Sequence, residues 1–143
     1  MGRILMRFID SNIFLYAMIK PKGNISKMIL ERKERSKRIL LRVENGEDVV
    51  TTVVHLSEVA NILEAKVSLT TAIKFLESLF LAENVKILPV SAEDYLKAIL
   101  LSKEKRISVN DALAYLKMKE LGIKEIYTFD RHFYNLDVKV VQE

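Results

Sequence analysis

The chain has 143 residues with 23 Lys and Arg, 19 Asp and Glu and a formal net charge of +4, and this length predicts a single domain over residues 1–143. A hydrophobic content of 50% together with 29% charged residues excludes a wholly disordered chain. The absence of cysteine excludes disulfides, thiolate nucleophiles and the usual structural zinc sites. The mildly basic balance permits a polyanionic partner without requiring one.

Polar residues interrupt the apolar N-terminal segment. Arg7, Asp10, Ser11 and Asn12 fall within the first twenty residues, which predicts neither a signal peptide nor a membrane span. We therefore expect a cytoplasmic protein that does not enter a membrane.

Strand and helix patterns alternate along the chain. Residues 3–9 are short, apolar and β-prone, and the Asp10-Ser11-Asn12 run that follows favours a helix N-terminus. Later segments predict helices over 26–44, 55–67, 70–82, 91–105 and 108–121, and strands over 48–54, 85–90, 125–129 and 138–141. This alternation predicts an α/β fold whose mostly parallel sheet is covered on both faces. In such sheets the functional site lies at the carboxyl ends of the strands.

Four acidic residues fall at that predicted edge. Asp10 ends the first strand and Asp130 ends the strand over 125–129, while Glu58 and Asp111 lie in the first turns of the predicted helices over 55–67 and 108–121. Each has a simpler interpretation when it is taken alone. Asp10, Asp111 and Asp130 are typical helix-capping residues, and Glu58 is a typical solvated surface residue.

Taken together, the four carboxylates predict a metal site. Two carboxylates about 4 Å apart repel each other by roughly 4 kcal/mol at an effective dielectric constant of ~20, so a cluster of them requires a cation. Oxygen ligands without cysteine or a histidine-rich motif favour Mg²⁺ or Mn²⁺ over zinc.

The segments around these acids resemble the four acidic motifs of the PIN-domain nucleases, most closely the VapC-type toxins. The segments are FIDSN at 8–12, HLSEVA at 55–60, SVNDA at 108–112 and TFDRHF at 128–133. Their order and spacing match over nearly the whole chain. The resemblance implies a three-layer α/β/α sandwich and Mg²⁺- or Mn²⁺-dependent cleavage of single-stranded RNA.

The resemblance also assigns roles to residues. Asp10, Glu58, Asp111 and Asp130 would be the catalytic, metal-binding carboxylates, with Asn12 and Thr128 as supporting polar residues that orient ligands or water. It further implies a homodimer and neutralisation by a small VapB-type antitoxin.

Three alternatives stay open at this point. A PIN nuclease can process RNA in other settings, without an antitoxin. His55 and His132 could serve as acid and base of a metal-free ribonuclease. A Mg²⁺-binding phosphoacceptor signalling domain also gathers aspartates at strand ends, but it needs adjacent acids at one strand end and a nearby lysine, which this chain does not supply.

The charged segment 31–38 has two interpretations. One is a solvated helix face with Glu31–Arg35 and Glu34–Arg38 pairs. The other is contact between RNA phosphates and Arg35 and Arg38. If four of the 19 acids are committed to a metal site, 15 remain against 23 basic residues, which makes the rest of the molecule more basic than the net charge suggests.

Overall fold

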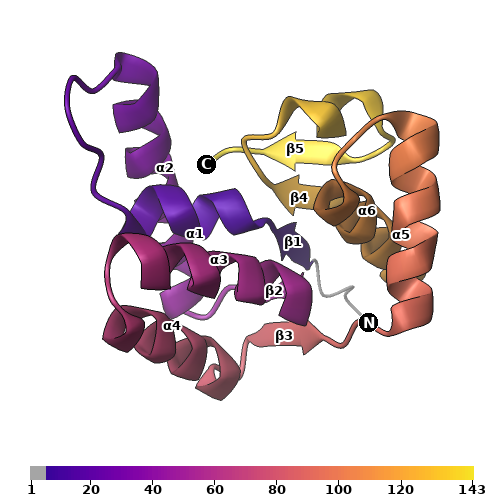
Figure 1. The fold of residues 1–143 in the computed structure, drawn as a ribbon, viewed down its shortest axis with the longest axis horizontal. Coiled ribbons are helices and arrows are strands. Elements are labelled where there is room, and N and C mark those ends of the chain that lie inside the picture. Colours follow the sequence, from indigo (N-terminus) through magenta and orange to yellow (C-terminus); the bar gives the residue numbers. More distant parts are fainter. Residues whose placement is uncertain (1–5) are drawn as a thin grey trace.

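A parallel five-stranded sheet forms the centre of the protein in the computed structural model, which describes residues 6–143 (Figure 1). Its strands are β1 (Arg7–Ile9), β2 (Val49–Thr52), β3 (Val85–Leu88), β4 (Glu125–Tyr127) and β5 (Lys139–Val141). They lie in the order β3-β2-β1-β4-β5, and all four pairings are parallel. The predicted parallel sheet is confirmed, and residues 3–5 of the first predicted strand lie outside the described residues.

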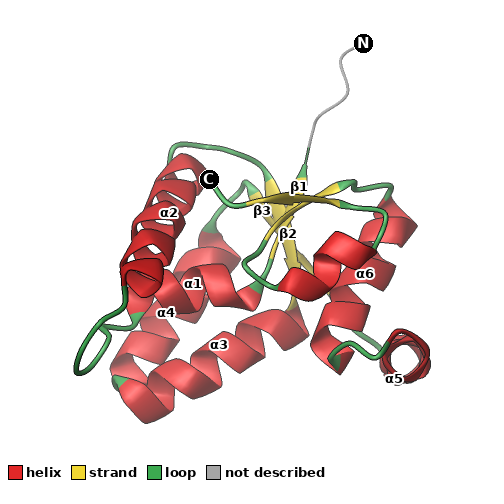
Figure 2. Ribbon diagram, turned by 90° about the horizontal axis from the view of Figure 1, so that it is seen from above, coloured by secondary structure: helices red, strands yellow, loops and turns green. Residues whose placement is uncertain are grey.

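Helices cover both faces of this sheet, which confirms the three-layer α/β/α arrangement. They are α1 (Ser11–Met18), α2 (Lys27–Glu44), α3 (Val53–Lys66), α4 (Leu69–Leu81), α5 (Ala92–Lys105) and α6 (Val109–Leu121), with a 3₁₀ helix η1 (Arg131–Asn135). Figure 2 shows α1 to α4 on one side of the sheet and α5 and α6 on the other.

Alternate strand residues supply the two cores. Ile9 and Tyr127 face α1 to α4 and belong to one buried cluster, whereas their neighbours Phe8 and Ile126 belong to a second cluster under α6 and η1. Because successive side chains of a strand point to opposite faces, β1 and β4 each bury two consecutive apolar residues, one in each cluster. Burial on both faces of the central strands explains these apolar pairs.

The junction between β2 and α3 differs from the prediction. The β-branched run was expected to remain extended through residue 54, but the strand ends at Thr52 and the helix begins at Val53. Thr52 caps this helix, because its Oγ1 accepts a hydrogen bond from His55 N at 3.1 Å. Glu58 therefore lies in the second turn of α3, and its expected place in the first turn was wrong.

None of the helices described between residues 6 and 143 is both long and apolar enough to cross a membrane.

We expect Ile126→Ala to lower the free energy of unfolding by about 2–5 kcal/mol, since Ile126 is fully buried in the strand beside β1. Urea denaturation followed by circular dichroism measures this change. Lys124→Ala, at an exposed position two residues earlier, is the control and should leave the midpoint nearly unchanged. Equal midpoints for the two variants would contradict the assignment of Ile126 to the core.

Candidate metal centre

Three aspartates converge at the carboxyl edge of the sheet. Asp10 follows β1 and caps α1, Asp130 follows β4 and caps η1, and Asp111 lies in the first turn of α6. Asp10 and Asp111 are each only 5% exposed. The sheet order makes β1 and β4 neighbours, and this brings together residues that are 120 positions apart.

Thr128 connects two of these acids. Its Oγ1 donates a hydrogen bond to Asp10 Oδ2 at 2.7 Å and accepts one from Asp130 N at 3.0 Å. Asn12 braces the same segment, since its Nδ2 donates to Thr128 Oγ1 at 3.3 Å and its Oδ1 accepts from Phe129 N at 3.3 Å. The two predicted supporting residues therefore contact each other and hold the segment that follows β4.

Asp111, Asp130 and His132 form a compact group of three potential metal ligands. One ligand atom from each lies within 4.8 Å of the others. His132 Nδ1 is 3.3 Å from Asp111 Oδ2 and 3.1 Å from Asp130 Oδ1. The backbone of Asp111 is fixed by the helix cap, because Ser108 Oγ accepts a hydrogen bond from Asp111 N at 3.0 Å.

Glu58 lies beside the aspartates and is held by their chain neighbours. Its Oε1 accepts from Asn110 Nδ2 at 2.6 Å and from Ser11 Oγ at 3.4 Å. Ser11 follows Asp10 and Asn110 precedes Asp111 in the chain, so Glu58 is fixed between the two buried acids. It does not belong to the group of donors within 4.8 Å.

The buried acids resist ionisation. Burial raises the pKa of Asp10 to about 6, despite the hydrogen bonds from Thr128 and Ser11 that favour its charged form. Burial, together with a hydrogen bond to Asp130 and the charges of Asp10 and Asp130, raises the pKa of Asp111 to about 8. Without a cation, the pocket thus favours protonated carboxyls, which is the behaviour expected of a site built to hold positive charge.

His55 has a structural place in the fold. It is fully buried, its Nδ1 lies 2.7 Å from Thr52 Oγ1, and its Nε2 lies 3.0 Å from the carbonyl oxygen of Asn110. Burial lowers the pKa of the His55 imidazole to about 4. A neutral ring with both nitrogens engaged is poorly suited to proton transfer with a substrate, so the geometry does not support the metal-free His55 and His132 pair.

His132 is the site residue that sequence reasoning assigned to another role. The predicted ligand set contained carboxylates alone, whereas the donor group includes this imidazole. The sequence feature that could have indicated His132 is its position two residues after the capping Asp130. In the structure Asp130 caps η1 by accepting a hydrogen bond from His132 N at 2.9 Å, and this turn brings the His132 side chain back toward Asp130. From the sequence, helix capping by Asp130 was the interpretation opposed to a metal-binding role, and His132 was considered only as an acid or base.

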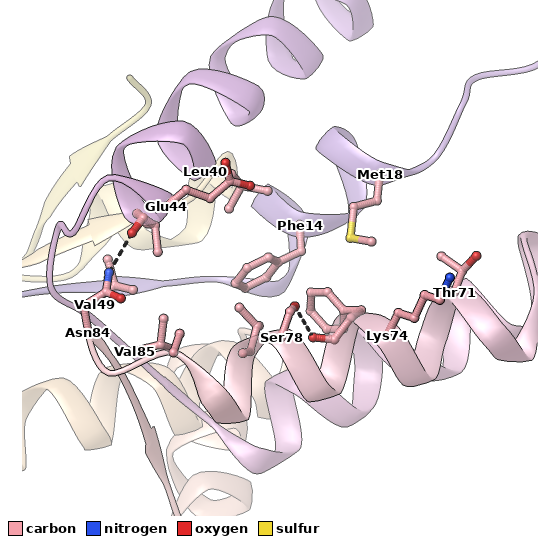
Figure 3. Close-up of a pocket in the computed structure, with 14 residues that line it drawn as sticks. Phe14, Met18, Leu40, Glu44, Val49, Thr71, Lys74, Ser78, Asn84 and Val85 are labelled. Carbon is pink, nitrogen blue, oxygen red and sulfur yellow. Dashed lines mark hydrogen bonds between the residues drawn. The ribbon is translucent and has the colours of Figure 1, made fainter.

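A large apolar cavity lies away from these acids. It has a volume of about 660 Å³ and opens between α1, α2 and α4, near the starts of β2 and β3 (Figure 3). Phe14, Met18, Leu40 and Val85 are among its lining residues, and only Glu44 and Lys74 among them are ionisable. An apolar cavity at the amino edge of the sheet lacks the groups that chemistry on a phosphodiester requires.

Residues 7–139 match the family model of the PIN domain. Because this match spans most of the chain, the protein belongs to the PIN domain family, the nuclease family that its four acidic motifs resemble. No curated protein sequence gives a significant match.

Solved structures with the same fold include toxins and toxin–antitoxin complexes. VapC20 of Mycobacterium tuberculosis, described as a Sarcin-Ricin loop cleaving toxin, superposes with a TM-score of 0.72 at 21% identity, covering 96% of this chain and 99% of that one. VapBC2 of Rickettsia felis, bound to a DNA fragment from its promoter, gives 0.62 at 15% identity, with 96% and 98% covered. A toxin–antitoxin complex from Klebsiella pneumoniae gives 0.62 at 14%, with 94% and 95% covered. At these identities the likeness establishes the shared fold.

The raised pKa values of Asp10 and Asp111 predict that the metal-free protein loses stability as pH rises. Both carboxyls ionise at higher pH in the folded state than at their ordinary value of 3.8, so their contribution is full below pH 4 and is lost between about pH 4 and 8. We expect the Tm in EDTA to fall across this range.

Asp111→Asn should flatten this pH dependence and raise the Tm at pH 8 by about 5 °C, because it removes the ionisation that the fold opposes. Differential scanning calorimetry at pH 5 and pH 8 measures both effects. Glu104→Gln, at an exposed position on α5, is the control and should retain the pH dependence of the unmodified protein. A Tm that rises from pH 5 to pH 8 in EDTA would contradict the electrostatic description of the site.

Proposed function

We propose that this chain is a single-domain, Mg²⁺- or Mn²⁺-dependent endoribonuclease that cleaves single-stranded RNA in the cytoplasm. The observation that carries the proposal is the group formed by Asp111, Asp130 and His132 next to the buried Asp10, at the strand edge where α/β folds place their sites. Membership of the PIN domain family supports the same chemistry.

The donor set fits a divalent cation. Asp10, Asp111 and Asp130 would hold it with hard oxygen ligands, and His132 adds an imidazole nitrogen that Mn²⁺ accepts more readily than Mg²⁺ does. The raised pKa values of Asp10 and Asp111 are consistent with a pocket whose carboxylates ionise fully only opposite positive charge. A bound cation of this kind lowers the pKa of water and offsets the charge that develops on the phosphate during hydrolysis.

Hydrogen bonds from neighbouring residues orient the carboxylates for cation binding. Thr128 and the Ser11 backbone amide fix both oxygens of Asp10, so its carboxylate needs no reorientation when a cation binds. Glu58, held between Ser11 and Asn110, is placed to orient an attacking water or to complete the ligand set. Asn12 keeps the 128–129 segment in register with α1.

We further propose that the ribonuclease is the toxin of a toxin–antitoxin pair. The solved structures that share its fold include a toxin and toxin–antitoxin complexes, and by analogy the partner is a small VapB-type antitoxin. A PIN nuclease that processes RNA without an antitoxin is the alternative, and the homodimer stays a prediction from the family resemblance.

We expect Asp10→Asn and Asp130→Asn to reduce cleavage of single-stranded RNA at least about 100-fold with the fold retained, since each removes a ligand charge. Excess EDTA should abolish cleavage by the unmodified protein, and Mg²⁺ or Mn²⁺ should restore it. Gel analysis of a labelled single-stranded oligonucleotide measures the rate, and Glu104→Gln is the control. Cleavage at the unmodified rate by either variant, or in EDTA, would show that the metal site is assigned wrongly.

The toxin role predicts growth arrest when the chain is expressed alone. Induction should stop growth, Asp10→Asn should relieve the arrest, and co-expression of an adjacent short antitoxin-like gene should restore growth and yield a co-purifying complex. Growth curves and affinity purification measure these outcomes. Normal growth with active enzyme present would favour the RNA-processing alternative.

A further inference from the structure

A second, polar cavity is lined by the two chain neighbours of Asp130, Phe129 and Arg131. It has a volume of about 290 Å³ and lies between α2 and the segment that runs from β4 into η1. Its lining includes Arg32, Arg35, Phe129, Arg131, Tyr134 and Gln142, and we call it the arginine pocket. This volume is at the lower end of the range for small-molecule sites.

The arginine pocket and the acidic site share one chain segment. Phe129 and Arg131, which line the pocket, are the residues on either side of Asp130. The position of this segment is fixed, because Phe129 N donates to Asn12 Oδ1 and Asp130 N donates to Thr128 Oγ1. The pocket and the candidate metal site are therefore joined through the backbone of residues 129–131, which carries Asp130 between two lining residues.

Positive charge dominates the pocket. Three arginines line it against a single acid, Glu31. The Arg32 guanidinium lies over the rings of Tyr16 and Phe129 and donates to Tyr16 Oη at 2.9 Å, which fixes its position.

The other two arginines retain donors for a ligand. Arg35 donates to Gln142 Oε1 at 3.2 Å, its Nε lies 3.9 Å from Glu143 Oε1, and its guanidinium has further N–H groups. Arg131 is exposed and forms no ion pair or side-chain hydrogen bond with any residue between 6 and 143. Guanidinium groups gathered in this way suit a phosphate, which accepts their planar pairs of N–H donors.

An aromatic ring stands at the rim of the pocket. Tyr134 is 60% exposed, and its Oη accepts a hydrogen bond from Gln142 Nε2 at 3.4 Å. An exposed tyrosine beside arginines provides a stacking surface for an unpaired base. An acidic peptide would use the arginines but would gain little from this ring.

We propose that the arginine pocket binds one nucleotide of single-stranded RNA next to the phosphodiester held at the acidic site, with its phosphate against Arg35 and Arg131 and its base stacked on Tyr134. This inference rests on the proposed ribonuclease function and names the subsite that positions its substrate. Arg35 lines the pocket and Arg38 does not, so of the two arginines predicted from the sequence only Arg35 belongs to this subsite. A separate phosphate contact by Arg38 stays a prediction.

Fluorescence anisotropy with a short labelled single-stranded RNA in EDTA tests the arginines. Arg35→Ala with Arg131→Ala should weaken binding by about 10-fold or more and reduce the slope of log K against log salt by about 0.7 for each phosphate that the protein no longer neutralises. Lys37→Ala is the matched control, because it removes an exposed positive charge from the same helix outside the pocket and should keep the affinity and slope near those of the unmodified protein. Both arginines are at least partly exposed, and an unchanged Tm verifies folding.

Tyr134 variants test the base contact. Tyr134→Leu should weaken binding about 10-fold, whereas Tyr134→Phe should preserve it, because stacking needs the ring and not the hydroxyl. An abasic oligonucleotide should bind the unmodified protein and Tyr134→Leu equally. A polyglutamate peptide should bind weakly and show no dependence on Tyr134.

The outcomes separate the subsite from the function. If the unmodified protein cleaves single-stranded RNA but the arginine variants match Lys37→Ala, the subsite is wrong and the ribonuclease stands. If polyglutamate binds as tightly as RNA and displaces it, the pocket serves an acidic protein partner instead. If the unmodified protein neither binds nor cleaves RNA, the proposed function fails and the subsite fails with it.

Discussion

Electrostatic repulsion among Asp10, Asp111 and Asp130 is the constraint that the surrounding structure must satisfy. Buried carboxylates close to one another are unstable as anions, yet the parallel sheet delivers them to one edge. The fold accommodates them with directed hydrogen bonds, from Thr128 and Ser11 to Asp10 and from Asn110 to Glu58. These bonds fix the orientation of the Asp10 and Glu58 carboxyl groups in the fold.

The positive charge of the molecule complements this acidic centre. The sequence pI near 9.2 is an average over a negatively charged region and a positively charged region, which share the segment around Asp130. One region concentrates carboxylates and suits a cation, and the other presents Arg35 and Arg131 and suits an anion. In the proposed function, a single phosphodiester chain would use both regions, with hydrolysis at the first and anchoring at the second.

The sequence predicted the layered parallel fold because its signals are local and strong. Asp10 caps a helix where one was expected, and Ser26, Ser91 and Ser108 cap helices whose predicted ranges start at these residues. Alternating strands and helices also leave few topologies. The start of α3 was missed because Val53 and Val54 favour strands, whereas the Thr52 cap and tertiary packing decided for a helix. The motifs placed the acids at one edge, and the short turn capped by Asp130 brings His132 back to that edge. The arginine pocket is lined by residues of α2 and η1, which are far apart in the chain and leave no local signature.

The strand order also determines when the acidic site can come into existence. Asp10 lies near the beginning of the chain, but Thr128 and Asp130, which complete its surroundings, belong to the segment after β4. A ribosome makes the chain from the N-terminus, so a nascent chain shorter than about 130 residues contains Asp10, Glu58 and Asp111 without the strand that assembles them. Addition of β4 beside β1 is thus the step at which the growing polypeptide gains its complete acidic site, after most of the fold has been synthesised.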